Sequence, residues 1–480
     1  MAAVRSFLKE EGRRAWLVGG TVRDLLLGLD PLDVDLAVTG DPRELARRFA
    51  DATGGSFFIL SEKFKACRVA CSSAAREEHD GGVKGAPPCP GNTWDFVALR
   101  GDSIDADLRA RDFTVNAMAV ELPGGEEVID PLGGRADLAS RRLKAASSGA
   151  FDDDPLRLLR AVRLEREAGL RAGRETEKLI RSRAGLAARP APERIFAELV
   201  RLLQAPGPAD GIRRLDGLGL LEPLLPEIYA LKGVRQNEYH HLDVYNHTLA
   251  NMTALDRIVR GPASFFPGQA EEIIRRRKNT FGGVSWRSLM MSASLTHDIA
   301  KPFCRSAGDD GQVRFLGHDR EGGGMAAALL CRLKAPGEFV RAVSFLVRRH
   351  MRFEGLLQQQ PPSARARLRY LRATAPLAPE LIMLSVSDRL SVRGRLVSRE
   401  DIELHLKLAR EMMEMCFAPE SAPPPRLVRG DDLIRELSLE PGPVIGKLLD
   451  RIEEEQQLGH VTTRWQALAA AARMLGEEGK

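Results

Sequence analysis

The spacing of apolar residues changes near residue 140. Before this point, short apolar runs of strand length alternate with segments of helical spacing. The strand-like runs are residues 15–18, 34–38, 66–70 and 94–99, and the helical segments are residues 21–27 and 41–52. After residue 150, apolar residues recur every three or four positions, which is typical of helices that bury one face. The pattern predicts an α+β N-terminal head, a mixed sheet with flanking helices, followed by an all-α remainder.

Polar stretches rich in Gly and Pro interrupt the pattern. Residues 72–92 predict a long mobile hairpin tip, and residues 189–192 and 419–425 predict linkers. A chain of 480 residues exceeds the usual size of one hydrophobic core, so several domains are expected.

The composition describes a soluble globular chain, with 44% hydrophobic and 29% charged residues and a net charge of +5. No apolar run approaches the roughly 20 residues needed to cross a bilayer, and residues 1–20 carry too many charges for a signal peptide. The six cysteines are scattered, without a CxxC pair, which favours reduced thiols in a cytoplasmic protein. Because the net charge is small, it does not indicate nucleic-acid binding by itself, although a local basic surface could still bind a nucleic acid.

Acidic and glycine residues near the N-terminus form the first group with recognisable chemistry. Asp33 and Asp35 are two positions apart on a predicted strand, so their side chains share one face and could bind Mg²⁺. Gly19-Gly20 precedes a predicted helix, where backbone N–H groups can approach a phosphate closely. Arg23 follows one turn later and could pair with that phosphate. The combination favours a phosphoryl-transfer site.

These residues resemble the first motif of class II nucleotidyltransferases. That family comprises CCA-adding enzymes, their CC-adding and A-adding relatives, and bacterial poly(A) polymerases. The resembling residues are Leu17-Val18-Gly19-Gly20-Thr21-Val22-Arg23-Asp24 and Asp33-Val34-Asp35. Later motifs of the family resemble, in the same order, residues 111–118, 129–134, 153–163 and 193–199. Five ordered motifs between residues 14 and 205 make chance a negligible explanation.

The resemblance implies that Asp33 and Asp35 bind two Mg²⁺ ions during phosphoryl transfer. Asp95, on a neighbouring predicted strand, is a candidate third acid. The implied nucleotide-binding residues of the first two motifs are Gly19, Gly20, Arg23, Arg111, Asp112 and Asn116.

The fourth motif resembles the family's nucleotide-selecting helix, with Asp153 where the family has Glu. Asp154 and Arg157 are three positions apart on that predicted helix, so we expect them to share a face and orient each other. An acceptor and a forked donor can read the edge of a base. Arg160, one turn further on, could reach a phosphate of the bound nucleotide.

Histidines form the second group, because six of the nine lie between residues 240 and 350. They are His240, His241, His247, His297, His318 and His350. The order His247, His297-Asp298, Asp388 resembles the HD phosphohydrolase superfamily, which often adds ligands at the places of His318 and His350. Imidazole with carboxylate suits Mn, Ni, Fe or Zn, or alternatively Mg²⁺, and such a site can activate water against a phosphoester. The alternative is a degenerate HD fold that serves as an RNA-binding body.

Arginines are the candidate RNA contacts. Arg194 in the final motif, and Arg367 and Arg369 in a later basic helix, could bind the phosphates of a tRNA acceptor end. The alternative for the later helix is a solvated face.

The leading hypothesis is therefore a tRNA nucleotidyltransferase that uses CTP and ATP, with neither DNA nor a membrane as partner. Alternatives are a poly(A) polymerase and a metal-dependent phosphohydrolase with a nucleotide-sensing head. The expected domains are a head, a helical neck, an HD-like domain and a helical tail, at residues 1–140, 141–230, 231–400 and 401–480.

The connection from Arg100 to Arg111 bears on how far addition proceeds. Full CCA-adding members carry a flexible loop before the second motif, and this connection is too short for that loop. A stiff connection would fix the base-reading pair in one geometry, which favours a single base. We expect addition of two C residues and then a stop. The alternative is full CCA addition, with residues 72–92 substituting for the loop.

Overall fold

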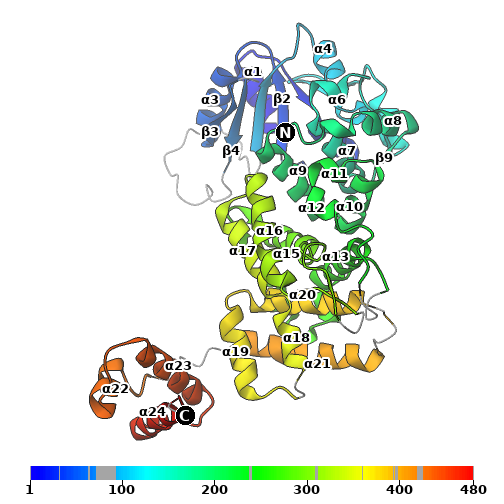
Figure 1. Ribbon diagram of the computed structural model, residues 1–480. Helices are drawn as coiled ribbons and strands as arrows, with labels where there is room; N and C mark the ends of the chain where they lie inside the picture. Colours follow the sequence, from blue (N-terminus) through cyan, green and yellow to red (C-terminus); the bar gives the residue numbers. More distant parts are fainter. Residues whose placement is uncertain are drawn as a thin grey trace. The chain divides into compact units, whose positions relative to one another are not determined.

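The protein is described by a computed structural model (Figure 1). The described residues are 2–31, 33–62, 65–71, 93–236, 241–308, 312–358, 361–392, 394, 398–418 and 425–478. The predicted tip at residues 72–92, His240 and most of the break at residues 419–425 lie outside them. The chain forms two compact units, residues 1–206 with 211–224 and residues 207–210 with 225–480. The expected four-domain division stays a prediction.

A seven-stranded sheet forms the centre of the first unit. Its strands are β1 (Ala15–Val18), β2 (Asp33–Val38), β3 (Ser56–Ser61), β4 (Ala66–Ala70), β5 (Thr93–Ala98), β6 (Ala119–Leu122) and β7 (Val128–Ile129). Their order is β3-β4-β5-β2-β1-β6-β7. Only β2 and β5 pair in parallel, and the other neighbours are antiparallel. The predicted mixed sheet is confirmed, although β3, β6 and β7 were not predicted.

Different helices cover the two faces of this sheet. On one face, Phe49 of α3 (Pro42–Thr53) packs against Trp94 and Phe96 of β5, with ring centroids 5.3 and 5.4 Å apart. Helix α1 (Ala2–Glu10) adds Phe7 to this cluster. On the other face, α2 (Gly20–Leu26) follows β1, and Leu108 of α4 (Ile104–Arg109) packs on β1 and β2. Asp33 and Asp35 lie on this second face, because they alternate with the buried side chain of Val34.

Helices and two short strands complete the first unit. The helices are α5 (Gly134–Ala139), α6 (Ala150–Asp153), α7 (Leu156–Glu167), α8 (Arg174–Ser182), α9 (Pro192–Gln204) and α11 (Leu221–Leu224). The two-residue strands β8 (Arg142–Leu143) and β9 (Arg171–Ala172) pair in parallel. The expectation of no strands after residue 150 is therefore wrong in detail, because pairs of this length leave no period in the sequence. Arg163 of α7 pairs with Glu198 of α9 at 2.5 Å, so a buried ion pair joins these helices.

Long helices build the second unit. The principal ones are α13 (Val244–Arg260), α15 (Trp286–Thr296), α16 (His318–Arg332), α17 (Gly337–Arg349), α20 (Ala378–Ser391) and α21 (Arg399–Phe417). Shorter helices are α12 (Pro226–Tyr229), α14 (Ala270–Arg276), α18 (Arg352–Leu357) and α19 (Ala364–Thr374). Helix α10 (Pro208–Gly217) has its first residues in this unit and the rest in the first unit. Helix α13 packs against both α15 and α20, and α16 packs along α17. Two two-residue hairpins, β10–β11 (Thr280–Phe281, Val284–Ser285) and β12–β13 (Ser306–Ala307, Val313–Arg314), interrupt the helices.

The last three helices have a hydrophobic core of their own. They are α22 (Gly430–Leu437), α23 (Pro443–Gln457) and α24 (Arg464–Glu478). Leu433, Leu448 and Ala471 are among the buried residues of this core. Because the apolar faces of these helices turn toward one another, the C-terminal segment is a small helical bundle.

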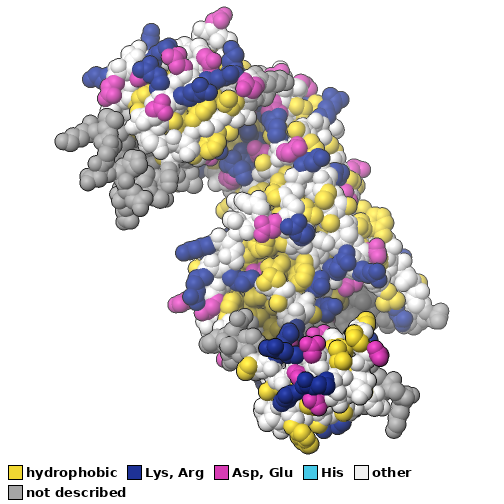
Figure 2. Space-filling view, turned by 90° about the vertical axis from the view of Figure 1, so that its left-hand side faces the viewer, with side chains coloured by type: hydrophobic (Ala, Val, Ile, Leu, Met, Phe, Trp, Pro, Cys, Tyr) yellow, Lys and Arg dark blue, Asp and Glu magenta, His cyan; other side chains and the backbone are white. Residues whose placement is uncertain are grey.

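Surface charge is mixed. Figure 2 shows Lys and Arg side chains interspersed with Asp and Glu over the visible face. Among the described residues, no helix combines the length and the apolarity that a membrane span requires.

Candidate active sites

Three aspartates lie together on the first unit's sheet. Asp33 and Asp35 are on β2, and parallel pairing places Asp95 of β5 beside Asp35. Arg68 of β4 donates two hydrogen bonds to the Asp95 carboxylate, at 2.7 and 2.8 Å. Asp33 accepts a hydrogen bond from Thr93. The structure thus brings together the two predicted metal ligands and the candidate third acid, and adds a cation, Arg68, that the sequence did not single out.

The charge of Asp35 is poorly compensated. Burial, together with the neighbouring Asp95 and Asp33 carboxylates, raises the pKa of Asp35 to about 6, although Arg111 acts in the opposite direction. A divalent cation at this position would offset that repulsion directly. The donor set, carboxylate oxygens only, is the one that Mg²⁺ prefers.

Gly19 is required by the packing around Asp35. Its φ of +70° lies in the left-handed region, and a Cβ there would be 2.8 Å from Nη1 of Arg111 and 3.2 Å from Oδ2 of Asp35. A Cβ at this position would require the end of the Arg111 side chain to shift from its place beside Asp35. The Gly-Gly turn therefore allows the backbone to approach the acidic group closely.

A chain of polar contacts connects the first two predicted motifs. Arg23 is buried and donates to Oδ1 of Asp24 and to Oδ1 of Asn116, both at 2.8 Å. Asn116 donates in turn to Asp112 at 3.1 Å, and Arg160 donates to the same carboxylate at 3.1 Å. Burial raises the pKa of Asp112, but the charge of Arg160 and the Asn116 hydrogen bond outweigh it, so the net pKa is lowered.

This chain changes the expected geometry of two cations. The sequence predicted Arg23 and Arg160 as phosphate contacts. In the structure both guanidinium groups are bound to acidic or amide side chains, because both project into the packed region between the motifs. Their contact with a nucleotide stays a prediction.

The expected pairing of Asp154 with Arg157 is wrong. Asp154 has an extended backbone, with φ −145° and ψ 97°, and lies before the start of α7. Its carboxylate pairs with Arg194 at 2.7 Å. The following Pro155 explains this, since a residue before proline is disfavoured in the helical region.

Arg157 is instead fixed by backbone carbonyl groups. Its guanidinium donates to the oxygens of Ala110, Ala150 and Arg111, at 2.9, 3.1 and 3.4 Å. Burial is the main reason that its pKa is lowered. Ala110 and Arg111 end the short connection that contains α4, so this connection itself orients Arg157.

A cavity of about 450 Å³ opens beside the acidic group. Its polar lining includes Asp35, Asp107, Lys65, Arg100 and Arg111. Lys65 is exposed, and its φ of +42° is unusual for a residue other than glycine. Three cations beside carboxylates suit a phosphate-bearing ligand. Lys65 and Arg100 were not predicted, because neither belongs to a recognised motif.

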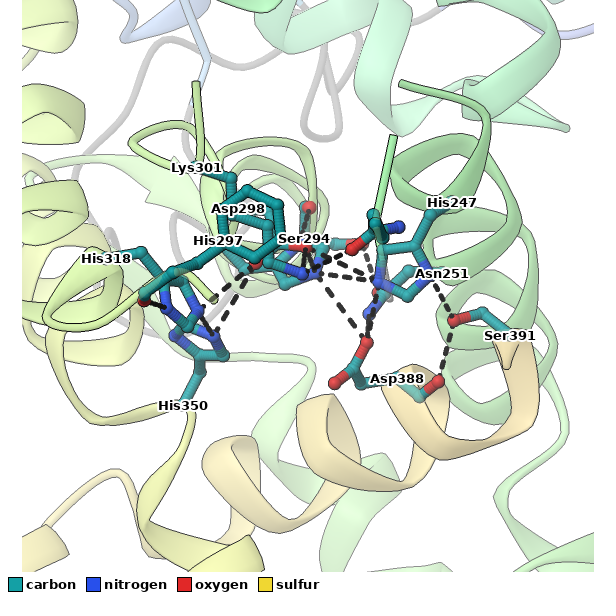
Figure 3. A network of polar contacts seen from close by, with 12 residues as sticks. His247, Asn251, Ser294, His297, Asp298, Lys301, His318, His350, Asp388 and Ser391 are labelled. Carbon is teal, nitrogen blue, oxygen red and sulfur yellow. Dashed lines mark hydrogen bonds and ion pairs between the residues drawn. The ribbon is translucent and has the colours of Figure 1, made fainter. Parts of the chain in front are cut away.

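The predicted histidine and aspartate group is brought together in the second unit (Figure 3). His247 comes from α13, His297 and Asp298 follow α15, and Asp388 lies on α20. Nε2 of His247 is 2.9 Å from Oδ1 of Asp388 and 3.5 Å from Oδ2 of Asp298. We call His247, His297 and Asp298 the first triad; their potential ligand atoms lie within 4.8 Å of one another.

His318 and His350 form a second triad with the same Asp298. Their Nε2 atoms are 3.4 and 3.9 Å from Oδ1 of Asp298, whereas the first triad faces Oδ2. Asp298 therefore lies between the two groups of histidines, and its two oxygens face different triads (Figure 3). Lys301 pairs with Oδ2 at 2.7 Å.

The histidine tautomers favour cation binding. Nδ1 of His297, His318 and His350 each donates to a backbone carbonyl oxygen at 2.7 Å. In the neutral ring this leaves a lone pair on Nε2. The Nε2 atoms of His247 and His297 are 3.4 Å apart, and those of His318 and His350 are 3.3 Å apart. The Nε2 lone pairs of neutral His318 and His350 face each other at this distance and repel unless a proton or a metal ion lies between them.

Charges within this group set its protonation. Burial lowers the pKa of His297, but the Asp298 and Asp388 carboxylates outweigh it, so the net pKa is raised. Burial and the neighbouring His318 lower the pKa of His350 to about 4. Burial opposes ionisation of Asp298, yet His297 and Lys301 hold its pKa well below the ordinary value. His350 is therefore neutral and able to bind a metal at pH 7.

The candidate RNA-binding arginines all have acidic partners. Arg194 pairs with Asp154 at 2.7 Å, Arg367 with Glu411 at 2.9 Å and Arg369 with Glu454 at 2.9 Å. The two arginines of α19 are therefore ion-paired in the structure. RNA binding by these residues would require exchange of these ion pairs and stays a prediction.

Comparisons with known proteins agree with the family resemblance of the N-terminal motifs. Residues 15–144 match the family described as the poly A polymerase head domain, and residues 169–231 match the probable RNA and SrmB-binding site of polymerase A. An A-adding tRNA nucleotidyltransferase of Deinococcus radiodurans is 35% identical, with 96% of both chains covered. A CC-adding tRNA nucleotidyltransferase of Thermus thermophilus is 33% identical, covering 95% of this chain and 92% of the relative.

Solved structures share the fold. A CCA-adding enzyme in complex with CTP superimposes with a TM-score of 0.61 at 22% identity, covering 98% of this chain and 93% of that one. A Thermotoga maritima CCA-adding enzyme complexed with tRNA gives a TM-score of 0.57 at 21% identity, covering 98% and 94%. With relatives above 30% identity over nearly the whole length of both chains, the protein belongs to the class II family of CCA-adding tRNA nucleotidyltransferases.

Proposed function

We propose that the protein adds C or A nucleotides to the 3′ end of tRNA, using CTP or ATP. The observation that carries this proposal is the group of Asp33, Asp35 and Asp95 beside a basic cavity. Divalent cations held by Asp33 and Asp35 would supply activation of the RNA 3′-hydroxyl and neutralisation of the leaving pyrophosphate.

The residues around the aspartates have distinct roles in this proposal. Gly19 lets the triphosphate approach the backbone closely, while Arg111, Lys65 and Arg100 in the cavity balance phosphate charge. Arg68 occupies both oxygens of Asp95, which leaves Asp33 and Asp35 as the carboxylates free to bind a cation.

Asp35→Ala is the direct test. The variant should lose nucleotide addition but stay folded, with a thermal unfolding midpoint no lower than that of the wild type, because the change removes a proposed metal ligand and no apolar core contact. The assay contains Mg²⁺ as the only divalent ion, with labelled CTP or ATP and tRNA lacking its CCA end. Addition at a near wild-type rate would show that Asp35 is misassigned.

Two alternatives are less well supported. A poly(A) polymerase would extend any RNA 3′ end with A alone, whereas the curated relatives named above are tRNA nucleotidyltransferases. A phosphohydrolase with a nucleotide-sensing head would not need both Asp33 and Asp35 on the same strand face. The same assay separates these functions, because the first would add A to unrelated RNA and the second would add nothing.

We also propose that the two triads bind divalent metal ions and hydrolyse phosphoesters, as in an HD domain. The facing Nε2 atoms and the position of Asp298 between them support two adjacent metal ions. Such ions would supply activated water, and the residues of the chain would hold them through Nε2 and carboxylate oxygens. Lys301, beside Asp298, would balance the charge of a substrate phosphate.

The test of this second activity combines metal content with hydrolysis. The full chain should bind Mn²⁺, Ni²⁺ or Co²⁺ and cleave 2′,3′-cyclic or monoester phosphates. Metal-loaded protein without activity on either class of phosphoester would refute the hydrolase and favour an RNA-binding body.

A further inference from the structure

Asn251 lies at the junction of the three helices that carry the first triad and Asp388. It follows His247 by one turn of α13 and has no exposed surface. Its Oδ1 accepts a hydrogen bond from Ser294 of α15 at 2.6 Å. The same Oδ1 lies 3.1 Å from Oγ of Ser387 on α20, whose single hydroxyl hydrogen it shares with the carbonyl oxygen of Leu384 at 2.7 Å. Its Nδ2 donates to Oδ1 of Asp388 at 3.4 Å (Figure 3). One buried amide thus contacts all three helices.

The acceptor on Asp388 is the oxygen that faces the histidines. Oδ1 of Asp388 lies 2.9 Å from Nε2 of His247 and 3.7 Å from Nε2 of His297. The amide therefore restrains the carboxylate with this oxygen toward the first triad. Rotation of Asp388 about its side chain would break the hydrogen bond to Asn251 and turn Oδ1 away from the histidines.

Burial of a polar side chain at this position costs folding free energy, so its presence indicates a role that an apolar side chain could not fill. Helix junctions are usually filled by apolar side chains, and burial of an amide requires that its donors and acceptors be matched. Among the described residues, the partners of this amide are two hydroxyl groups and a carboxylate, each from a helix that also bears, or directly precedes, a potential metal ligand. The hydrogen bonds of Asn251 therefore connect the three helices at the place where their potential metal ligands come together.

We infer that Asn251 is a positioning residue for the metal site of the first triad, acting through Asp388 without touching the metal or the substrate. The inference rests on the proposed metal binding of the triads. Partners that orient metal ligands commonly change metal affinity by about 10–100-fold when they are replaced.

Asn251→Asp is the test variant. It keeps the size of the side chain and an acceptor for Ser294 and Ser387, but it loses the N–H donor to Asp388. We expect Mn²⁺ binding at the first triad to weaken by about 10–100-fold, measured by titration of Mn²⁺ alone into the full-length chain. Nucleotide addition should be unchanged, since it uses residues of the other unit. Mn²⁺ binding as tight as in the wild type would overturn the inference.

Two further variants control for general damage to the helix junction. Thr248→Val alters a buried hydroxyl on the same helix that has no hydrogen-bond partner among the described residues, so Mn²⁺ affinity should not change. Ser294→Ala keeps Asn251 but removes the 2.6 Å bond that orients its amide, so it should weaken Mn²⁺ binding several-fold. If Asn251→Asp does not fold, Ser294→Ala decides the matter, because unchanged affinity there also refutes the positioning role.

The wild-type titration separates failure of this inference from failure of the proposed hydrolase. Wild-type protein that binds Mn²⁺ without hydrolysing phosphoesters refutes the hydrolase, and the variants still test the positioning role. A wild type that binds no Mn²⁺ overturns both. A wild type that binds and hydrolyses, beside an Asn251→Asp variant of equal affinity, overturns the inference alone.

Discussion

The guanidinium of Arg157 donates a hydrogen bond to the carbonyl oxygen of Ala110 at 2.9 Å. Arg157 lies at the start of α7, in the segment that resembles the nucleotide-selecting motif, and Ala110 directly follows α4. Two further carbonyl oxygens, of Ala150 and Arg111, complete its surroundings. The residue expected to read the base is therefore oriented by the connection that precedes the second motif, and not by Asp154.

Replacement of Arg157 by Ala should reduce base selectivity more than it slows transfer. The aspartates and the basic cavity remain, while the forked donor is lost; by analogy with direct readout, each base contact contributes about 1–3 kcal/mol of discrimination. The measurement compares incorporation of CTP and ATP with UTP and GTP. Arg183→Ala, which removes a partly exposed ion pair with Asp152, is the control. A variant with full wild-type selectivity would exclude a base-reading role.

The pKa of Asp35 predicts a pH-dependent effect on stability. Because the folded pKa is about 6 and the ordinary value is 3.8, the metal-free folded state binds a proton more tightly than the unfolded state. This favourable contribution is present below pH 4 and is lost as the pH rises through 6, so ionised Asp35 destabilises the protein at pH 8.

Asp35→Asn should therefore stabilise the metal-free protein at pH 8 and have little effect at pH 4. We expect a rise of roughly 2–4 °C in the unfolding midpoint of the first unit at pH 8 in the presence of a chelator. Calorimetry at both pH values checks this, with Asp105→Asn on exposed α4 as the control. Equal shifts at pH 4 and pH 8 would show that the pKa of Asp35 is not raised.

The sequence predicted those elements whose apolar and polar residues recur with a clear period, and it missed elements without such a period. Strands β1 and β4 have the predicted bounds, and β2 and β5 differ by one residue. Strand β3 was missed because it lies at the edge of the sheet with Phe58, Ile59 and Leu60 all partly exposed, so its apolar and polar positions do not alternate.

In the candidate sites, the sequence predicted which residues take part but not all of the contacts between them. The motifs named Asp33, Asp35, His297 and Asp298, because chemistry restricts which residues can bind metals. The predicted pairing of Asp154 with Arg157 required both residues to lie on one helix. Pro155 disfavours a helical backbone at Asp154, and this local rule could have been applied to the sequence. Arg68 depends on the register of strands β4 and β5, which no local pattern reveals.

Gly19→Ala should strongly reduce nucleotide addition. The new Cβ would lie 2.8 Å from Nη1 of Arg111, so Arg111 must move away from Asp35. Gly12→Ala is a control for a Cβ at positive φ, because Gly12 has a φ of +60° but no neighbouring atom within 4 Å. Both variants place a Cβ on a residue with positive φ, and only Gly19→Ala crowds the site. Equal activity of the two variants would refute the close-approach role of Gly19.

His297→Ala combined with Asp298→Ala should abolish metal-dependent phosphoester hydrolysis and spare nucleotide addition. The two groups of residues belong to different compact units, so their effects should be separable. Both activities are assayed on the same preparation, with His460→Ala as a control at an exposed histidine outside the triads. Hydrolysis that survives the double substitution would place that activity elsewhere.

The last prediction concerns the extent of addition. The connection from Arg100 to Arg111 consists mainly of α4, and its end fixes Arg157 through backbone oxygens. Because a fixed donor pattern suits one base better than two, we expect addition of two C residues to a tRNA that ends at the discriminator base, followed by a stop. The assay offers CTP and ATP together to tRNAs ending at the discriminator, after one C and after two C residues. Products ending uniformly in CCA would refute a fixed pattern. Extension only of the tRNA that already ends in CC, and only by A, would agree with a fixed donor pattern but show that the pattern selects A and not C. Both outcomes have precedent, since the curated relatives include A-adding and CC-adding enzymes.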